Sequence, residues 1–459
     1  MTLIPVTADA LTDDSTIINA ALADPAITTV ELPAGVVGVG SAIVIPSGKT
    51  LMGAGRELTT LLALPSFSQN VVVTSALRAV GVYVHDLTID ADRRGSGGGL
   101  GRRVNGLQMP YARRFTVRRV DVRNCTGYGH YVVGDTDNLQ EMAGDGTWED
   151  CRAANCEVHF EQMFAENITL INCHSRDGEG DVSCQSWFHP LTGSRDITYI
   201  GCTARGIAGA GIEATANVRD LERIRFIGCD VHVRGTTTAL ITSAGVGRTS
   251  RLELIGTRIH SDGGVGAQLH DTEAFATQSW ISGAVEGLQL SNNSSLVANG
   301  LELLGVTDPA SGGSAIGINV DASSRARFTG GRIEARGPVG RRLPLYGATA
   351  NVETSESTEI AGQTRYFKLM ESYGMRPIAK DGSNTAYVTI QLPNPVTNRD
   401  RAHLDFTIRR NGDGYLADRV TASWAFLDSR NVRVRLIGDA TLPTTAMLSF
   451  HFVEWGERS

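Results

Sequence analysis

Residues 197–202, ITYIGC, decide the fold, because the chain repeats their pattern. Residues 168–173 read ITLINC and residues 224–229 read IRFIGC. In each copy apolar and polar residues alternate, an Asn or Gly follows, and a cysteine closes the motif. Alternation is the period of a β-strand, and Asn or Gly supplies a tight turn. The motif therefore predicts a strand that ends in a turn, written many times over.

Further copies of the motif form a ladder along the chain. They end at Asp92, Cys125, Cys151, Thr257, Ala284 and, more weakly, Gly331. From Cys151 onward the copies stand about 22–29 residues apart, a period typical of stacked repeats. The units lack amphipathic helices, which disfavours leucine-rich and ankyrin repeats. In a stack, each small residue after the turn lies about 4.8 Å above its equivalent. We therefore expect a parallel β-helix in which the cysteines are a buried packing ladder.

Composition excludes several classes of protein. The 459 residues are 41% hydrophobic, enough for a large core, and the net charge of -7 disfavours nucleic-acid binding. No apolar run reaches the roughly 18 residues of a membrane helix, and the N-terminus lacks the pattern of a secretory signal. We expect synthesis in the bacterial cytoplasm and no membrane insertion. The seven cysteines include no CxxC, so a zinc ribbon is not predicted.

The N-terminal sequence resembles the opening of pectate-lyase-like right-handed β-helix proteins. The resemblance lies in DDSTIINAAL at 13–22 and in the LPAG and GAG turns between residues 28 and 63. It implies an all-β, single-stranded right-handed parallel β-helix that begins with a short capping helix around Ile17–Leu22. We expect the cap and first coil over residues 1–35 and the β-helix over residues 36–345.

The C-terminal sequence predicts a second domain. Five alternating segments, at 386–392, 403–410, 420–427, 432–438 and 447–455, are typical of antiparallel strands. We expect a connector over residues 346–380 and a β-sandwich over residues 381–459, for trimerisation or carbohydrate binding. The whole layout resembles phage tailspikes and spikes of phage-like particles. That resemblance implies a homotrimer on a particle surface that binds bacterial capsule or lipopolysaccharide. A sizeable N-terminal particle-binding domain is missing, so a particle or adaptor protein would bind at the N-terminal end.

A second strand after each ladder position carries the polar residues of the predicted site. Adjacent carboxylates raise each other's pKa, which keeps a general acid protonated, and aromatic rings stack on sugars. With Val158, Phe160 and Ile212 taken as inward, the neighbouring polar side chains share an outward face. The predicted catalytic residues are Glu157, Asp181 and Glu213, with Glu157 and Asp181 expected on adjacent coils about 5 Å apart. The predicted substrate-binding residues are Tyr128, His130, His159, Glu161, Ser183, Gln185, Trp187 and His189. Of these, Trp187 and His189 are expected on an insertion between coils, at residues 185–195.

Alternatives remain open at each point. The acidic residues could be an ordinary solvated face, and Trp187 could instead plug the core. Residues 177–181, DGEGD, could bind calcium, but turn chemistry is the simpler reading, and neither a metal site nor a cofactor is predicted. The phrase GYG at 127–129 lacks the Asp-Pro-His expected of a β-helix epimerase. Two functions survive: a spike that binds polysaccharide, and a depolymerase, hydrolase or lyase, that cleaves it.

Overall fold

The structure is a computed structural model that consists of two compact units, Met1–Gly362 and Gln363–Ser459. It describes residues 2–92, 103–135, 141–176, 184–207, 209–306, 314–337, 342–355, 357–361, 366–377, 379–380, 385–391, 402–410, 414–415, 420–427, 431–438 and 446–457. Each unit is described on its own. Within the described residues, no helix is long and apolar enough to cross a membrane.

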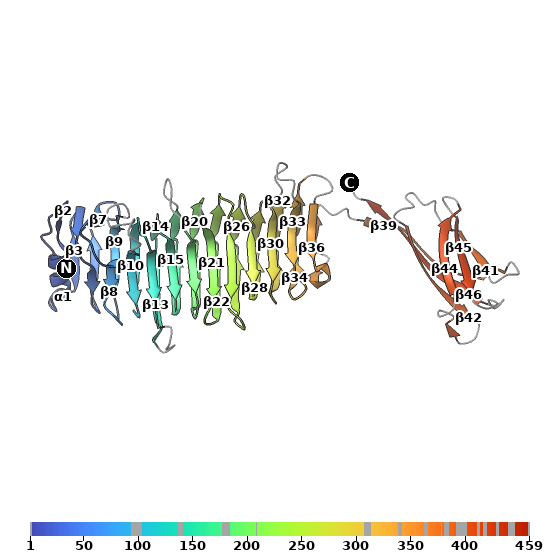
Figure 1. The fold of residues 1–459 in the computed structure, drawn as a ribbon, viewed down its shortest axis with the longest axis horizontal. Coiled ribbons are helices and arrows are strands. Elements are labelled where there is room, and N and C mark those ends of the chain that lie inside the picture. Colours follow the sequence, from blue (N-terminus) through green and yellow to red (C-terminus); the bar gives the residue numbers. More distant parts are fainter. Residues whose placement is uncertain are drawn as a thin grey trace. The chain divides into compact units, whose positions relative to one another are not determined.

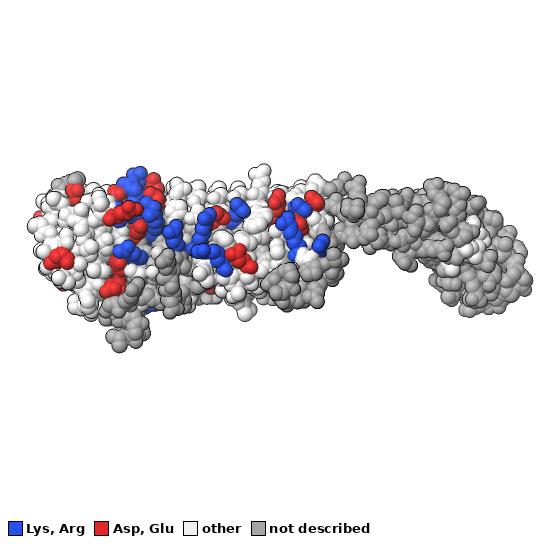
Figure 2. All heavy atoms as spheres, turned by 90° about the horizontal axis from the view of Figure 1, so that it is seen from above, with Lys and Arg blue, Asp and Glu red and all other residues white. Residues whose placement is uncertain are grey.

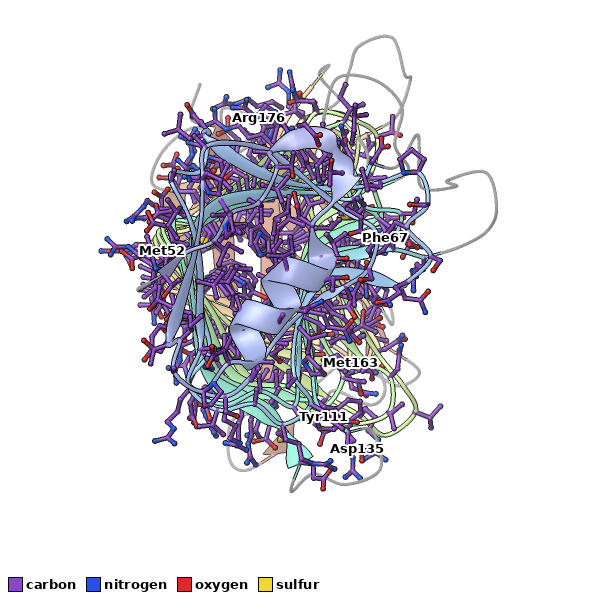
Figure 3. All side chains as sticks on the ribbon, turned by 90° about the vertical axis from the view of Figure 1, so that its left-hand side faces the viewer. Met52, Phe67, Tyr111, Asp135, Met163 and Arg176 are labelled. Atoms are coloured by element: carbon purple, nitrogen blue, oxygen red, sulfur yellow. The ribbon has the colours of Figure 1, made fainter. Side chains whose placement is uncertain are left out.

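The first unit is a parallel β-helix, whose coils stack side by side in Figure 1. Between the first coil, where α1 replaces the third strand, and the last described coil, each coil contributes strands to three faces, and these strands pair in parallel with their equivalents in the next coil. In the view along the coils (Figure 3), Met52 of face 1, Arg176 of face 2 and Met163 of face 3 lie on three different sides. The predicted fold class is confirmed.

The three faces are defined by their strands. Face 1 consists of β1 (Thr2–Leu3), β3 (Thr29–Leu32), β6 (Thr50–Gly53), the first halves of β9 (Tyr83–Asp90) and β11 (Thr116–Arg123), β13 (Ala143–Glu149), β16 (Ala165–Ile171), β19 (Arg195–Ile200), β22 (Leu221–Ile227), β25 (Ser250–Ile255), β28 (Thr272–Thr277), β31 (Ser295–Asn299), β34 (Arg325–Thr329) and β37 (Val352–Thr354). Face 2 consists of β2 (Asp9–Asp13), β4 (Gly35–Val39), β7 (Thr59–Ala63), the second halves of β9 and β11, β14 (Arg152–Ala154), β17 (His174–Arg176), β20 (Thr203–Gly206), β23 (Asp230–Val233), β26 (Arg258–Ser261), β29 (Trp280–Gly283), β32 (Glu302–Val306), β35 (Arg332–Arg336) and β38 (Glu359–Ala361). Face 3 is a twelve-stranded sheet of β5 (Ile43–Ile45), β8 (Val71–Ser75), β10 (Asn105–Pro110), β12 (Tyr128–Val133), β15 (Val158–Met163), β18 (Ser186–Leu191), β21 (Ala210–Ala216), β24 (Leu240–Ala244), β27 (Ala267–His270), β30 (Glu286–Ser291), β33 (Ala315–Val320) and β36 (Arg342–Gly347).

A single residue in the left-handed region turns the chain from face 1 to face 2. In ten successive coils its φ lies between 47° and 68°. These corner residues are Asp86, Arg119, Asp150, Asn172, Gly201, Gly228, Gly256, Gln278, Gly300 and Gly330. The corner N–H donates to the next coil, as from Asn172 to the Ile200 carbonyl at 2.9 Å. The Asn or Gly of the repeated motif therefore suits this corner, because these residues adopt a positive φ at the least cost.

The small residue after each corner forms the predicted packing ladder. The Sγ of Cys151 and the Sγ of Cys202 each lie 3.4 Å from a carbonyl oxygen of the preceding coil, and the Oγ1 of Thr257 lies 2.8 Å from one. All seven cysteines are free and buried. The register of the ladder needs correction at Cys125, because it lies with Cys156 at the opposite end of face 2. Loop lengths vary between coils, so motif alignment alone did not place it.

Further corrections to the register affect the ends of two other copies. Asp92 lies beyond the face 2 segment of β9, and Ala284 lies beyond β29. In the coil of Ala284, the corner residue is Gln278 and the buried residue after it is Ser279. This coil and the one before it span 22 residues from corner to corner (Gly256 to Gln278 to Gly300), against 28 and 30 in the coils on either side, and the sequence gives no direct sign of where they are shorter.

The core is closed at the N-terminal end and runs through the coils. The helix α1 (Ser15–Ala23) buries Ile18 and Leu22 against the first coils, as expected of a cap. Farther along, Phe160, Phe188, Tyr199 and Phe226 contact one another in sequence, with ring centroids 4.3–5.6 Å apart. Such contacts between coils fix the register that positions the surface side chains.

The described residues of the second unit form two four-stranded antiparallel sheets, the arrangement predicted for the C-terminal β-sandwich. One comprises β39 (Tyr366–Pro377), β46 (Ala446–Glu457), β42 (Ala402–Arg410) and β43 (Gly414–Tyr415), and the other comprises β40 (Ala379–Lys380), β41 (Thr385–Gln391), β45 (Asn431–Gly438) and β44 (Val420–Phe426). The stretch 346–380, expected to connect the units, instead holds β37 and β38 of the β-helix, the short 3-10 helix η2 (Thr349–Asn351) and β39 of the C-terminal unit. Apolar and polar residues alternate only weakly in this stretch, so the sequence pattern did not predict these strands.

Candidate functional site

A column of four polar side chains crosses successive coils on the outside of face 3. Tyr131 pairs with Glu161, Glu161 pairs with His189, and the same register places Glu213 after His189. Phe160 and Gln162 are wholly buried, so Glu161 between them points outward. With a coil spacing of about 4.8 Å, the column spans about 14 Å. We call these four residues the acid–histidine column.

Glu161 and His189 form a crowded ion pair within the column. The side chain of Glu161 is only 1% exposed, and its Oε2 lies 3.3 Å from Nδ1 of His189. The second oxygen, Oε1, and the second ring nitrogen, Nε2, have no hydrogen-bond partner among the described residues. Buried polar atoms are nearly always hydrogen-bonded. Both atoms are themselves buried, so a hydroxyl group or a water molecule that satisfied them would have to enter the column.

The charges of the column determine which hydrogen bonds it can make. Burial opposes protonation of His189, but the hydrogen bond and charge of Glu161, with the charge of Glu213, outweigh it and raise the pKa of His189. Burial, and next the charge of Glu161, raise the pKa of Tyr131, which therefore stays neutral. The column thus presents carboxylate acceptors beside imidazole and phenol donors.

The predicted catalytic residue Glu157 lies next to this column but has a different role. Its Oε2 accepts from Nε of Arg103 at 2.8 Å, and Arg103 also binds its other oxygen. The Arg103 guanidinium lies 4.8 Å from the ring centroid of Tyr128 and donates to its hydroxyl at 3.1 Å. Glu157 is thus held in a bidentate ion pair, and the group adds a charged edge to the site.

Three predicted substrate-binding residues are in the core, which corrects their assignment. His130 is fully buried, stacked on Phe160 with ring centroids 4.7 Å apart. His159 is also fully buried and contacts the Ser175 hydroxyl through Nδ1. Trp187 is fully buried too, so its alternative role in the core is the correct one. For His159 the cause is a break in alternation, since His159 and Phe160 are adjacent and both buried. For Trp187 the cause is that the expected insertion is strand β18 of face 3.

The remaining predicted residues are only partly placed. Asp181 and Ser183 lie outside the described residues, and so does the DGEGD loop at 177–181. The expected approach of Glu157 to Asp181 therefore stays a prediction. Gln185 is exposed just before β18, and its N–H donates to the Glu157 carbonyl at 2.7 Å. Of the predicted set, the structure brings together Glu161, His189 and Glu213.

Sequence reasoning missed Tyr131 and Arg103. Tyr131 directly follows His130, so reversing the inward and outward sides of that strand would have found it. Arg103 comes from an earlier coil, and no sequence pattern links it to Glu157.

A separate groove lies on face 2 and is rich in arginine. It has a volume of about 560 Å³, and its charged lining residues are Asp121, Arg123, Arg152, His174, Arg176 and Arg205. Several charges are already paired, as in Arg123–Asp90 at 2.7 Å and Arg205–Asp230 at 2.9 Å. Arg176 marks this side in Figure 3, and Figure 2, which views the molecule from above, shows basic and acidic side chains gathered on it. We call this surface the arginine groove.

No protein-family model matches the chain, and no curated protein matches it. Among solved structures, the A-module of the Azotobacter vinelandii mannuronan C-5 epimerase AlgE4 is 17% identical over 78% of this chain and 96% of its own, with a TM-score of 0.58. PfbA, a surface adhesin of Streptococcus pneumoniae, is 11% identical over 80% of this chain and 94% of its own, with a TM-score of 0.51. The Dettilon tailspike protein gp208 is 10% identical over 98% of this chain and 93% of its own, with a TM-score of 0.50. At such identities the likeness establishes the fold alone, the right-handed parallel β-helix.

Proposed function

We propose that the protein is the receptor-binding spike of a phage or phage-like particle and that it binds bacterial surface polysaccharide along face 3. The observation that carries the proposal is the acid–histidine column. It presents alternating acceptors and donors over four coils, and two of its buried polar atoms lack partners among the described residues. Sugar hydroxyl groups would supply such partners.

The structural neighbours support this proposal by what their names describe. One is a tailspike, one is a surface adhesin, and one is an epimerase of mannuronan. On this reading the capsule or lipopolysaccharide of the host is the ligand. The protein is made in the bacterial cytoplasm and reaches the particle surface, where a particle or adaptor protein holds its N-terminal end.

Cleavage of the same polymer is the second candidate, favoured by the Glu161–His189 pair. A carboxylate beside a histidine with a raised pKa can act in general acid–base chemistry. Glu161 and Glu213 lie two coils apart, about 10 Å between strands, near the upper separation for inverting glycosidases. A lyase would use one of these groups as the base.

A mixing experiment tests both candidates. Purified capsule and lipopolysaccharide fractions from candidate hosts are incubated with the protein, and polymer size and co-elution are followed by size-exclusion chromatography. Polymer that co-elutes intact supports binding, and polymer that shrinks supports the depolymerase.

Variants then test the site. Glu161→Gln, His189→Gln and Glu213→Gln should each weaken retention or turnover about tenfold or more, a loss of about 1.4 kcal/mol. The matched control is Glu286→Gln, which changes a half-buried carboxylate on the same sheet, hydrogen-bonded to Asn319 at 3.3 Å. It should behave like the unmodified protein. If all three site variants also do so, face 3 is the wrong surface.

A further inference from the structure

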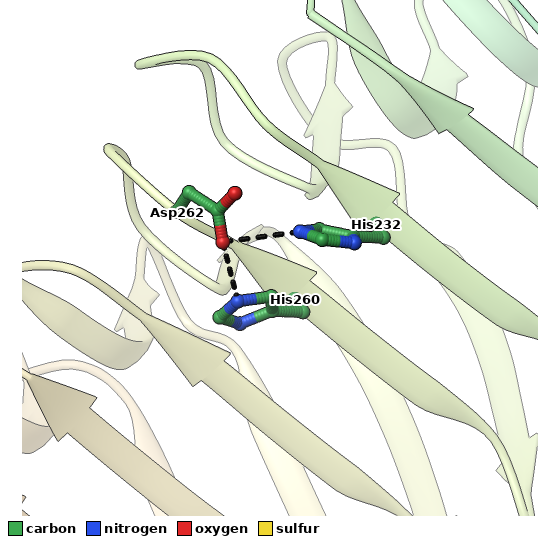
Figure 4. A group of neighbouring side chains, drawn as sticks. All are labelled: His232, His260 and Asp262. Carbon is green, nitrogen blue, oxygen red and sulfur yellow. Dashed lines mark hydrogen bonds and ion pairs between the residues drawn. The ribbon is translucent and has the colours of Figure 1, made fainter.

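Two histidines and an aspartate converge on face 2, away from the acid–histidine column. His232 on β23 pairs in register with His260 on β26, and Asp262 follows β26. The Nε2 atoms of His232 and His260 lie 3.0 Å and 2.6 Å from the same oxygen, Oδ1 of Asp262. Figure 4 shows both rings directed at this oxygen. One potential ligand atom from each residue lies within 4.8 Å of the other two.

This spacing is close to that of ligands around a metal ion. Tetrahedral zinc binds histidine nitrogen and carboxylate oxygen at about 2.0–2.2 Å, which places the ligand atoms about 3.3 Å from one another. Small side-chain rotations would therefore admit an ion. The three side chains are 33–43% exposed, so an ion could enter and keep positions open to water.

Neighbouring groups hold the rings in the orientation that a metal ligand needs. Nδ1 of His260 is hydrogen-bonded to the Ser282 hydroxyl at 2.5 Å, from the next strand of face 2. With Ser282 as acceptor, the Nε2 of His260 carries its lone pair toward Asp262, and a cation between the two is then favourable. The His232 and His260 rings lie side by side with centroids 4.8 Å apart and planes tilted by 42°, and the centroids of the His260 and Trp280 rings are 5.5 Å apart. Strand pairing and these ring contacts thus preorganise the cluster.

We propose that His232, His260 and Asp262 bind one divalent transition-metal ion of the zinc type. Two imidazoles and one carboxylate suit zinc and its first-row neighbours, whereas calcium and magnesium prefer oxygen ligands. The two arginine side chains nearby have other partners and so do not prevent metal binding. Arg205, which precedes His232 in register, is paired with Asp230, and Arg258 lies over Trp280. The site is independent of the polysaccharide proposal.

The test uses the full-length protein after chelator treatment and dialysis. Isothermal titration with Zn²⁺ should give one tight site per chain, and Zn²⁺ should raise the melting temperature while Ca²⁺ and Mg²⁺ do not. The absorption spectrum with Co²⁺ should show nitrogen and oxygen ligation without a thiolate charge-transfer band. That last readout excludes binding to the seven buried cysteines.

Variants give the decisive comparison. His232→Gln and His260→Gln should each lower the affinity for Zn²⁺ at least tenfold, and Ser282→Ala should lower it about tenfold through loss of ring orientation. The matched control is His270→Gln. His270 lies on face 3 and, like His260, is hydrogen-bonded through Nδ1 to a serine, Ser291, at 2.5 Å. It should bind Zn²⁺ as the unmodified protein does. Absence of a stoichiometric site, or a site that survives both His232→Gln and His260→Gln, overturns the proposal.

Discussion

His130 and His159 are titratable residues in the middle of an otherwise apolar core. Burial lowers the pKa of His130 to about 4 and that of His159 to about 3, from a usual value of about 6.5. His130 contacts the Arg152 carbonyl through Nε2 at 3.0 Å. His159 contacts the Ser175 hydroxyl through Nδ1 and accepts from the Cys156 N–H through Nε2 at 3.4 Å. Both rings are therefore neutral in the folded protein, and protonating either one opposes folding.

Because both rings are buried in the neutral form, we expect the free energy of unfolding to decrease in mild acid. As the pH falls below about 6.5, the unfolded chain takes up protons that the folded chain refuses. Stability should be complete above pH 6.5 and should decline down to about pH 4 for His130, by on the order of 3 kcal/mol. His130→Phe, which extends the Phe160–Phe188 stack, should flatten that decline in urea midpoints measured from pH 7.5 to pH 4.5.

Trp187→Phe is the control for this measurement, because it alters the core without a titrating group. It should lower stability by a similar amount at every pH. A decline as steep in His130→Phe as in the unmodified protein would show that other groups cause it.

At the scale of the element, the corner between faces 1 and 2 recurs in coil after coil with the same positive φ. At Gly228, with φ of 60°, a Cβ would meet no atom within 4 Å, so only backbone strain opposes substitution. Asn172 and Gln278 occupy the same position in other coils. Gly228→Asn should therefore cost little. Gly228→Val should lower the free energy of unfolding by about 1–2 kcal/mol, because a β-branched residue resists the left-handed region.

Thermal and urea unfolding of the two variants check this prediction. Equal losses for Asn and Val would mean that the corner is not under backbone strain. Thr257→Val offers a second comparison, at the position directly after the corner residue Gly256 of the next coil. It keeps the shape but removes the hydroxyl that bonds to the Phe226 carbonyl at 2.8 Å.

These corners also explain how far the sequence predicts the structure. Strand alternation and the left-handed turn are local, so ITLINC and ITYIGC predict the coil, the corner and the buried cysteine. Coil length is not local, and Cys125 and Ala284 were misplaced because intervening loops differ in length. The residues of the candidate site were likewise predicted only where the local strand pattern holds. Glu161 and Glu213 were found by alternation, whereas His130 and His159 were assigned outward because alternation fails near His159. Trp187 and His189 were chosen from a stretch expected to be an insertion between coils, which is in fact β18.

The metal cluster was missed for a related reason. His232 and His260 occupy equivalent positions in consecutive coils, which is visible in VHVRG at 231–235 and RIHSD at 258–262. That spacing places two imidazoles side by side on face 2. Only the corner after β26 brings Asp262 back to them, and a turn of that kind has no sequence signature.

At the scale of the whole molecule, the C-terminal unit contains a long edge strand. The twelve-residue β39 pairs along one side with β46, and no described strand pairs with its other side. A long unpaired edge is a template for association unless something covers it. Homo-oligomers close by symmetry, and a second copy of the same sheet is a natural partner. We propose that these units associate as a homotrimer, as the tailspike resemblance implies.

The trimer is tested by light scattering on the purified protein. The full chain should give about three times the 48.9 kDa of one chain, and residues 1–362 alone should give the mass of a single shortened chain. The shortened chain should keep its strand circular dichroism and its unreactive cysteines, because every face of the β-helix lies before residue 363. A full chain at 48.9 kDa would exclude the trimer. A shortened chain that still trimerises would move the interface to the β-helix.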